Sequence, residues 1–170
     1  YNFILFNAYY ASIGVFPIDT FLHYDSGYKF LKGEIPVRDY WIVHGLTIDL
    51  IQTLFFYFFG VNWISYVAHS SIFNGIIAIF FLKFLTLYKV EKKIALIITT
   101  AFITITYSIS GTPFLDLHST FFSLFAFFCF WFFLEQRKHY LFIFIPIFFI
   151  LAFFSKPTPS SYFFIIFLFI

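Results

Sequence analysis

The chain has little of what a water-soluble domain of its size needs. Only 11% of its 170 residues are charged, Met is absent, and the single cysteine, Cys129, lies inside an apolar run. One cysteine excludes a disulfide framework and a cysteine metal site, and a formal net charge of +2 gives no reason to expect a nucleic-acid partner. Hydrophobic residues make up 62% of the chain, which exceeds what one soluble core of this size buries. The composition therefore predicts a multi-pass integral membrane protein.

The apolar runs predict an all-α fold, a polytopic bundle of transmembrane helices forming a single domain over residues 1–170. We expect the chain to be a piece of a longer protein, truncated at both ends, because it starts at Tyr1 without a methionine and stops at Ile170 within an apolar run. The polar stretch 17–61 is expected to form an outer loop with two membrane-surface helices, at about 19–32 and 46–59. The predicted spans are the end of a first one at 1–16, then 62–88, 94–109, 114–134 and 141–155, with a sixth starting at 160–170.

Basic residues in two short loops set the expected orientation. These residues, which belong on the cytoplasmic side, are Lys89, Lys92 and Lys93 in one loop and Arg137 and Lys138 in the other. Residues 46–59 are short for a span, which needs about 20 residues. Their polar side chains, among them Asp49 and Gln52, fall near one side of a helical wheel. We therefore expect this helix to lie on the membrane surface, which puts the loop 17–45 outside; if it crossed instead, that loop would be cytoplasmic.

With this topology, six of the eight acidic residues fall on the outer side, which favours an outward-facing site in the inner or plasma membrane. Asp19 either caps the helix that ends at Gly33 or offers an unpaired carboxylate. Asp116 either caps the span at 114–134 or faces a cavity. Polar groups on the span at 62–88, such as His69, are expected to join helices inside a bundle.

Lys156 is singled out by a length argument. The run 141–154 gives about 21 Å of helix against a hydrocarbon core of about 30 Å. Either that helix starts earlier, at His139, or the break at 156–159 (KPTP) lies below the outer surface. Irregular backbone at that depth is tolerated where it lines protein or water, so Lys156 is predicted to bind substrate. The alternative is a lysine that snorkels from a helix end.

The order of these motifs resembles a known superfamily. Asp19 is followed by a helix ending in FLKG, then EIPVRDYW, then HG, then a short helix ending in FFG, and the likeness continues into GTPFLDLHST at 111–120 and FFSKPTP at 153–159. This layout resembles the first outer loop of the GT-C multispanning glycosyltransferases, which include protein O-mannosyltransferase-like and lipid A aminoarabinose transferase-like enzymes. The resemblance implies transfer of a sugar, with inversion, from a polyprenyl-phosphate donor to a lipid, glycan or protein acceptor.

Residue by residue, the resemblance makes Asp19 the catalytic base, since such a step needs a group that takes the acceptor's proton. Lys156 would hold the phosphate leaving group. The remaining substrate-binding candidates are Asp116, Asp39, His44, Arg38 and His118, of which Arg38 and Asp39 are alternatively a local ion pair. No cofactor is expected: Thr20 replaces the acidic residue that often follows the family's aspartate, and the histidine spacing matches no compact metal motif. The competing hypothesis is a transporter or lipid-handling protein in which the break at 156–159 forms the substrate site.

Overall fold

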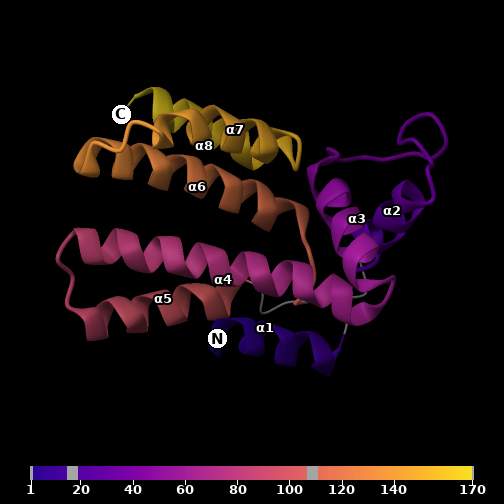
Figure 1. Cartoon of the computed structure of the whole chain (residues 1–170), viewed down its shortest axis with the longest axis horizontal. Coiled ribbons are helices and arrows are strands. Elements are labelled where there is room, and N and C mark those ends of the chain that lie inside the picture. Colours follow the sequence, from indigo (N-terminus) through magenta and orange to yellow (C-terminus); the bar gives the residue numbers. More distant parts are fainter. Residues whose placement is uncertain (1, 15–18, 107–110, 170) are drawn as a thin grey trace. The chain divides into compact units, whose positions relative to one another are not determined.

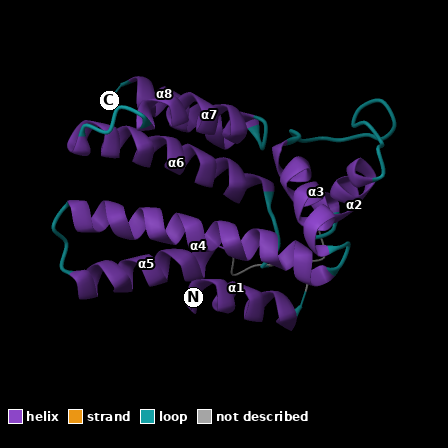
Figure 2. Cartoon of the chain, in the orientation of Figure 1, coloured by secondary structure: helices purple, strands orange, loops and turns teal. Residues whose placement is uncertain are grey.

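The computed structural model describes residues 2–14, 19–106 and 111–169, and all regular secondary structure within these ranges is helical (Figures 1 and 2). The predicted all-helical class is therefore confirmed, and each of the eight predicted helical stretches overlaps one helix. The helices are α1 (Asn2–Ile13), α2 (Leu22–Leu31), α3 (Thr47–Phe59), α4 (Trp63–Leu87), α5 (Lys92–Thr106), α6 (Leu115–Gln136), α7 (Leu141–Phe153) and α8 (Pro157–Leu168).

Two of the helices, α4 with 25 residues and α6 with 22, are long and apolar enough to cross a membrane. At a rise of about 1.5 Å per residue they extend for roughly 37 and 33 Å, against a hydrocarbon core of about 30 Å. The helices at the other predicted spans are shorter, with 15 residues in α5 and 13 in α7. The described residues thus contain two candidate membrane-spanning helices, and the multi-pass topology stays a prediction.

The chain forms two compact units. The first comprises residues 1–41 and 49–114, and the second comprises 42–48 and 115–170. In the first unit α4 packs against both α1 and α5, because its inward face carries apolar and small polar side chains. The fully buried residues at these contacts include Tyr66 and Ile77 of α4 and Ala95 and Ile103 of α5.

In the second unit α6 packs against both α7 and α8, which also contact each other. Aromatic rings fill this packing; Phe149 on α7 lies edge-on to Phe164 of α8, with ring centroids 5.3 Å apart. The segment 42–48 is held at the turn between α7 and α8, where the Thr47 N–H donates to the Phe154 carbonyl at 3.1 Å. Gly45 lies so close to Phe154 that a Cβ at this position would collide with its backbone. Only glycine therefore permits this approach.

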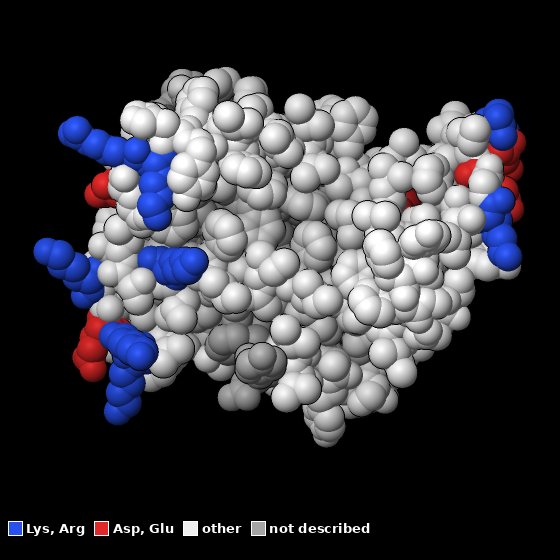
Figure 3. All heavy atoms as spheres, in the orientation of Figure 1, with Lys and Arg blue, Asp and Glu red and all other residues white. Residues whose placement is uncertain are grey.

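Charged residues of the first unit form two groups at opposite ends of α4 (Figure 3). One group, which includes Lys89, Lys92 and Lys93, lies at the turn between α4 and α5. The other lies on α2 and the loop that follows it, and includes Lys29 and Arg38. Between the groups, α4 and α5 expose apolar side chains such as Ile79 (54% exposed), Ile97 (60%) and Ile105 (74%). A belt of exposed apolar surface between charged ends is unusual for a protein surrounded by water.

Candidate functional site

Asp19 lies in a turn before α2 and is exposed. Its backbone is left-handed, with φ of 65°, a conformation that Asp adopts more readily than most residues. Its carbonyl accepts a hydrogen bond from the Leu22 N–H at 3.2 Å. The interpretation of Asp19 as a helix cap is wrong, because α2 begins three residues later and its N-cap is Phe21. The Asp19 carboxylate consequently has no polar partner among the described residues.

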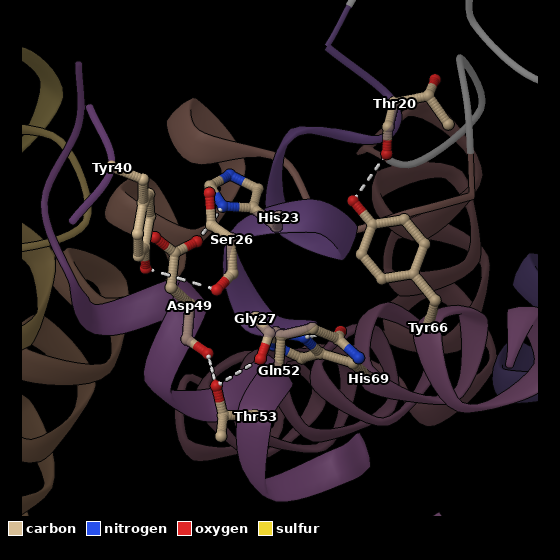
Figure 4. Close-up of polar contacts among 10 residues, drawn as sticks. All are labelled: Thr20, His23, Ser26, Gly27, Tyr40, Asp49, Gln52, Thr53, Tyr66 and His69. Atoms are coloured by element: carbon tan, nitrogen blue, oxygen red, sulfur yellow. Dashed lines mark hydrogen bonds and ion pairs between the residues drawn. The ribbon is translucent and has the colours of Figure 1, made fainter. Parts of the chain in front are cut away.

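The backbone beside Asp19 is anchored to α4. Thr20 is buried, and its carbonyl accepts a hydrogen bond of 2.6 Å from the Tyr66 hydroxyl (Figure 4). Tyr66 is itself fully buried and lies edge-on to Tyr24 of α2, with ring centroids 5.4 Å apart. The exposed carboxylate of Asp19 therefore lies next to a residue whose backbone is hydrogen-bonded to α4.

The polar side of α3 faces the protein. Asp49 and Gln52 are fully buried, although their place on the helical wheel suggested a membrane-surface helix. Asp49 Oδ1 lies 2.7 Å from Nδ1 of His23 on α2, and Gln52 Oε1 lies 2.9 Å from Nδ1 of His69 on α4 (Figure 4). The polar side of α3 thus has partners on two other helices. The predicted role of His69 in joining helices agrees with this contact.

The outward side of α3 is apolar. Leu50, Leu54 and Phe58 repeat every four residues and are 41%, 56% and 70% exposed. A helix of a water-soluble protein turns such a stripe inward. The distribution of polar residues around a helical wheel does not distinguish a face turned to water from one turned to protein partners. The sequence therefore does not predict the burial of Asp49. Whether α3 lies on a membrane stays a prediction.

Close packing brings α2 onto α3 at Gly27. A Cβ at this position would lie 2.9 Å from Cγ of Gln52. The Thr53 hydroxyl lies at this contact, 3.1 Å from the Gly27 carbonyl and 2.7 Å from the Asp49 carbonyl. His23 and Asp49 offer a nitrogen and an oxygen of the kinds that bind divalent metals. The expectation that no metal is needed is neither supported nor contradicted by this pair.

Arg38 and Asp39 form the local ion pair that the sequence left as one alternative. Nε of Arg38 donates to Oδ1 of Asp39 at 2.9 Å and Nη2 donates to Oδ2 at 2.7 Å. The Ile35 N–H donates to Oδ2 as well, at 2.7 Å. The Arg38 hydrogen bonds, followed by that of Ile35, lower the pKa of Asp39 to about 2. The pair closes the loop after α2, and its predicted contact with substrate stays a prediction.

The second unit contains the other four predicted site residues. Nζ of Lys156 lies 2.8 and 2.9 Å from the two carboxylate oxygens of Asp116, in a pair that remains partly exposed, with 37% of the lysine side chain and 45% of the aspartate side chain accessible. Asp116 lies in the first turn of α6, where the helix dipole favours an acid. His44 is half-buried, and His118 is fully buried within α6. Of these four, Lys156 and Asp116 have the accessible polar groups best suited to binding a ligand.

Lys156 occupies the break between α7 and α8 that the sequence predicted. It is the N-cap residue of α8 with an extended backbone, and its side chain makes no cap hydrogen bond. Its carbonyl instead accepts hydrogen bonds from the hydroxyls of Ser119 on α6, at 2.7 Å, and Ser160 on α8, at 3.1 Å. The turn is therefore fixed against α6 while the ammonium group extends to the partly exposed pair.

Comparison of the chain with protein-family models, with curated proteins and with solved structures finds no match. The likeness to GT-C glycosyltransferases therefore rests on the order of the motifs in the sequence.

Proposed function

We propose that this protein is a multi-pass membrane glycosyltransferase that moves a sugar from a polyprenyl-phosphate carrier to an acceptor hydroxyl on the outer side of the membrane. The observation that carries the proposal is the state of Asp19, an exposed carboxylate without a partner among the described residues, next to the buried and anchored Thr20. Among the described acids of α2, α3 and the loop between them, all except Glu34 are either paired with a basic side chain or buried. Asp19 therefore suits the role of base better than these paired or buried acids.

In the proposed reaction Asp19 takes the proton of the acceptor hydroxyl as its oxygen attacks the anomeric carbon of the sugar. The new glycosidic bond forms on the face of the sugar opposite the leaving group. The bond between the anomeric carbon and the carrier's phosphate oxygen breaks, and its electron pair stays on that oxygen. Inversion follows from this single displacement. The buried pair of His23 and Asp49, 2.7 Å apart, would act indirectly by holding α2 on α3.

Lys156 would stabilise the negative charge that develops on the carrier phosphate. An ammonium group has three N–H donors, and the partly exposed pair with Asp116 leaves donor capacity for a phosphate oxygen. The position of Lys156 in a helix break is also what the competing proposal, a transporter with a broken-helix site, would use. A transporter would bind the lipid phosphate without consuming the sugar bond.

The membrane setting is supported by helix length and by surface composition. Both α4 and α6 are long enough to cross the hydrocarbon core. The exposed isoleucines of α4 and α5 lie between the two charged groups of the first unit. Orientation follows the basic loops, with the turn around Lys89 to Lys93 on the cytoplasmic side.

The test is Asp19→Asn in the intact protein, assayed by release of polyprenyl phosphate from donors carrying hexoses or pentoses in native membranes. Loss of a general base is expected to lower the rate by about 10²–10⁴-fold with membrane insertion unchanged. The matched control is Asp25→Asn, which removes an exposed partner of Lys29 in the same region and should leave the rate as it was. Sugar transfer at the original rate by Asp19→Asn would remove Asp19 from the mechanism, and binding of the donor without turnover by the unchanged protein would favour the transporter.

A further inference from the structure

The turn between α4 and α5 carries a surplus of positive charge (Figure 3). Residues 83–93, here called the basic turn, contain one acid, Glu91, and four lysines: Lys83, Lys89, Lys92 and Lys93. All five residues are exposed, and none of them forms an ion pair with another described residue. Four lysines and one glutamate give this segment a formal charge of +3, which no acid in contact with it reduces.

The backbone of the basic turn is fixed at the end of α4. The Val90 N–H donates to the Leu85 carbonyl at 3.2 Å, and the Lys89 N–H donates to the Thr86 carbonyl at 3.0 Å. Lys89 is left-handed, with φ of 57°, at the position where a helix end of this kind usually has glycine. A lysine thus occupies a position that glycine adopts with less strain, and its side chain starts from a fixed backbone.

Apolar side chains continue from the basic turn along both helices. On α4, Ile79 is 54% exposed and precedes Lys83 by four residues; on α5, Ile97 is 60% exposed and follows Lys93 by four. Residues four apart on a helix lie on the same side. Each of these two lysines therefore has exposed hydrocarbon one turn away, a combination that matches a molecule with an anionic head and hydrocarbon chains.

Partners of other kinds match only part of this surface. A small anion would contact the lysines and leave the isoleucines exposed. An acidic protein segment would bring backbone N–H and C=O groups that need partners, and isoleucine side chains supply none. A phospholipid contacts both parts, because its phosphate meets the lysines while its acyl chains meet the isoleucines.

We propose that the basic turn binds the head group of an anionic phospholipid of the cytoplasmic leaflet, with the phosphate at Lys89, Lys92 and Lys93 and an acyl chain along the exposed isoleucines of α4 and α5. Along α4 this turn lies about 30 Å from Tyr66, whose hydroxyl hydrogen-bonds to the backbone beside Asp19. The lipid is therefore at the opposite end of the first unit from the proposed base and takes no part in sugar transfer. The inference shares with the proposed function only the membrane setting.

The experiment measures binding of single lipid molecules to the intact protein by native mass spectrometry. The protein in detergent micelles is titrated with phosphatidylglycerol or with phosphatidylcholine of the same acyl chains, and phosphatidylglycerol is expected to bind more tightly. A lysine near a membrane surface contributes about fivefold to such binding. The double variant Lys92→Gln/Lys93→Gln should therefore raise the dissociation constant for phosphatidylglycerol roughly 25-fold.

The matched control is the double variant Lys29→Gln/Lys32→Gln on α2. It removes the same charge from the other charged group of the first unit, at a distance well beyond the range of screened charge interactions, and should change the dissociation constant less than about twofold. All four lysines are on the surface or partly exposed, so both variants are expected to keep the helix content of the unchanged protein by circular dichroism. Equal weakening by the two double variants would overturn the assignment to the basic turn.

The lipid itself is tested in the unchanged protein. Equal dissociation constants for the two lipids would overturn the preference for an anionic head group. Glycerophosphoglycerol, the same head group without acyl chains, is expected to leave bound phosphatidylglycerol in place. Displacement by glycerophosphoglycerol at the concentration at which the lipid binds would overturn the lipid in favour of a small anion.

The outcome is independent of the transferase proposal. Asp19→Asn is expected to bind phosphatidylglycerol as the unchanged protein does while it loses sugar transfer. Selective binding of phosphatidylglycerol by a protein that transfers no sugar would support the lipid contact and refute the transferase. Sugar transfer by a protein that binds the two lipids equally would refute the lipid contact and leave the transferase standing.

Discussion

Two contacts of α2 with an acidic side chain have the same length but differ in burial, so they separate the effect of burial from that of distance. His23 Nδ1 lies 2.7 Å from Asp49 Oδ1, and both side chains are 1% exposed. Lys29 Nζ lies 2.7 Å from Asp25 Oδ2, with the side chains 34% and 62% exposed. The perturbation is the removal of the acid from each pair, by Asp49→Ala and by Asp25→Ala.

The expected effects differ severalfold. Asp49→Ala leaves the buried His23 imidazole without its carboxylate partner. Such a loss lowers the free energy of unfolding by about 1–3 kcal/mol for a neutral group and 3–5 kcal/mol for a charged one. We expect a loss of about 3 kcal/mol. Asp25→Ala removes an exposed contact between residues four apart on a helix, which water and salt screen, and we expect about 0.5 kcal/mol or less. Asp49→Asn keeps the shape and one hydrogen-bonding oxygen, so its cost is expected to lie between these two.

The assay is reversible unfolding of the purified protein in detergent micelles, followed by far-ultraviolet circular dichroism over a denaturant series. Each variant's free energy of unfolding is compared with that of the unchanged protein under one set of conditions. A cost for Asp49→Ala no larger than that for Asp25→Ala would refute the conclusion that the contact between α2 and α3 is a buried polar contact that stabilises the first unit.

Two further predictions concern the loop after α2 and the close approaches of glycine. Asp39 is expected to titrate with a pKa of about 2, below its usual 3.8. Its contribution to stability is therefore present above about pH 4 and is lost as the pH falls through about 2. A carboxyl titration midpoint near 4, measured by NMR, would contradict the ion pair. Gly45→Ala should cost more than about 4 kcal/mol, because the new Cβ meets the backbone of Phe154. Gly75→Ala is expected to change stability by less than about 1 kcal/mol, since its Cβ meets only the side chain of Ile4, at 2.9 and 3.2 Å; equal shifts of the two thermal midpoints would contradict the difference between backbone and side-chain contact.

Much of the helical layout follows from local pattern. The predicted stretch 62–88 lies within one residue at each end of α4 (Trp63–Leu87). The predicted stretch 114–134 lies within two residues at each end of α6 (Leu115–Gln136). These boundaries are local because a helix ends where apolar periodicity stops and turn residues follow. A short apolar run and two prolines predict a break at 156–159 for the same reason; the structure places the break at 154–156, because the prolines begin α8 rather than precede it.

The partners of polar residues that pair across long stretches of the chain are not predictable in this way. Asp49 pairs with a residue 26 positions away, and Lys156 pairs with one 40 positions away. The place of Asp19 before a helix suggests a cap, but its backbone is left-handed and α2 begins three residues later. Such outcomes depend on packing between helices and on the turn that precedes them.

By itself the sequence determined the helical class, the approximate helix positions, the predominance of apolar surface and the list of acidic and basic candidates, since each depends on composition or on neighbours within a few turns. Only the tertiary structure decided that Asp49 is buried against His23, that Lys156 pairs with Asp116, and that Asp19 is left exposed. The physical reason is that a side chain's solvation and partners are set by helices far away in the chain, and their packing is absent from any local pattern.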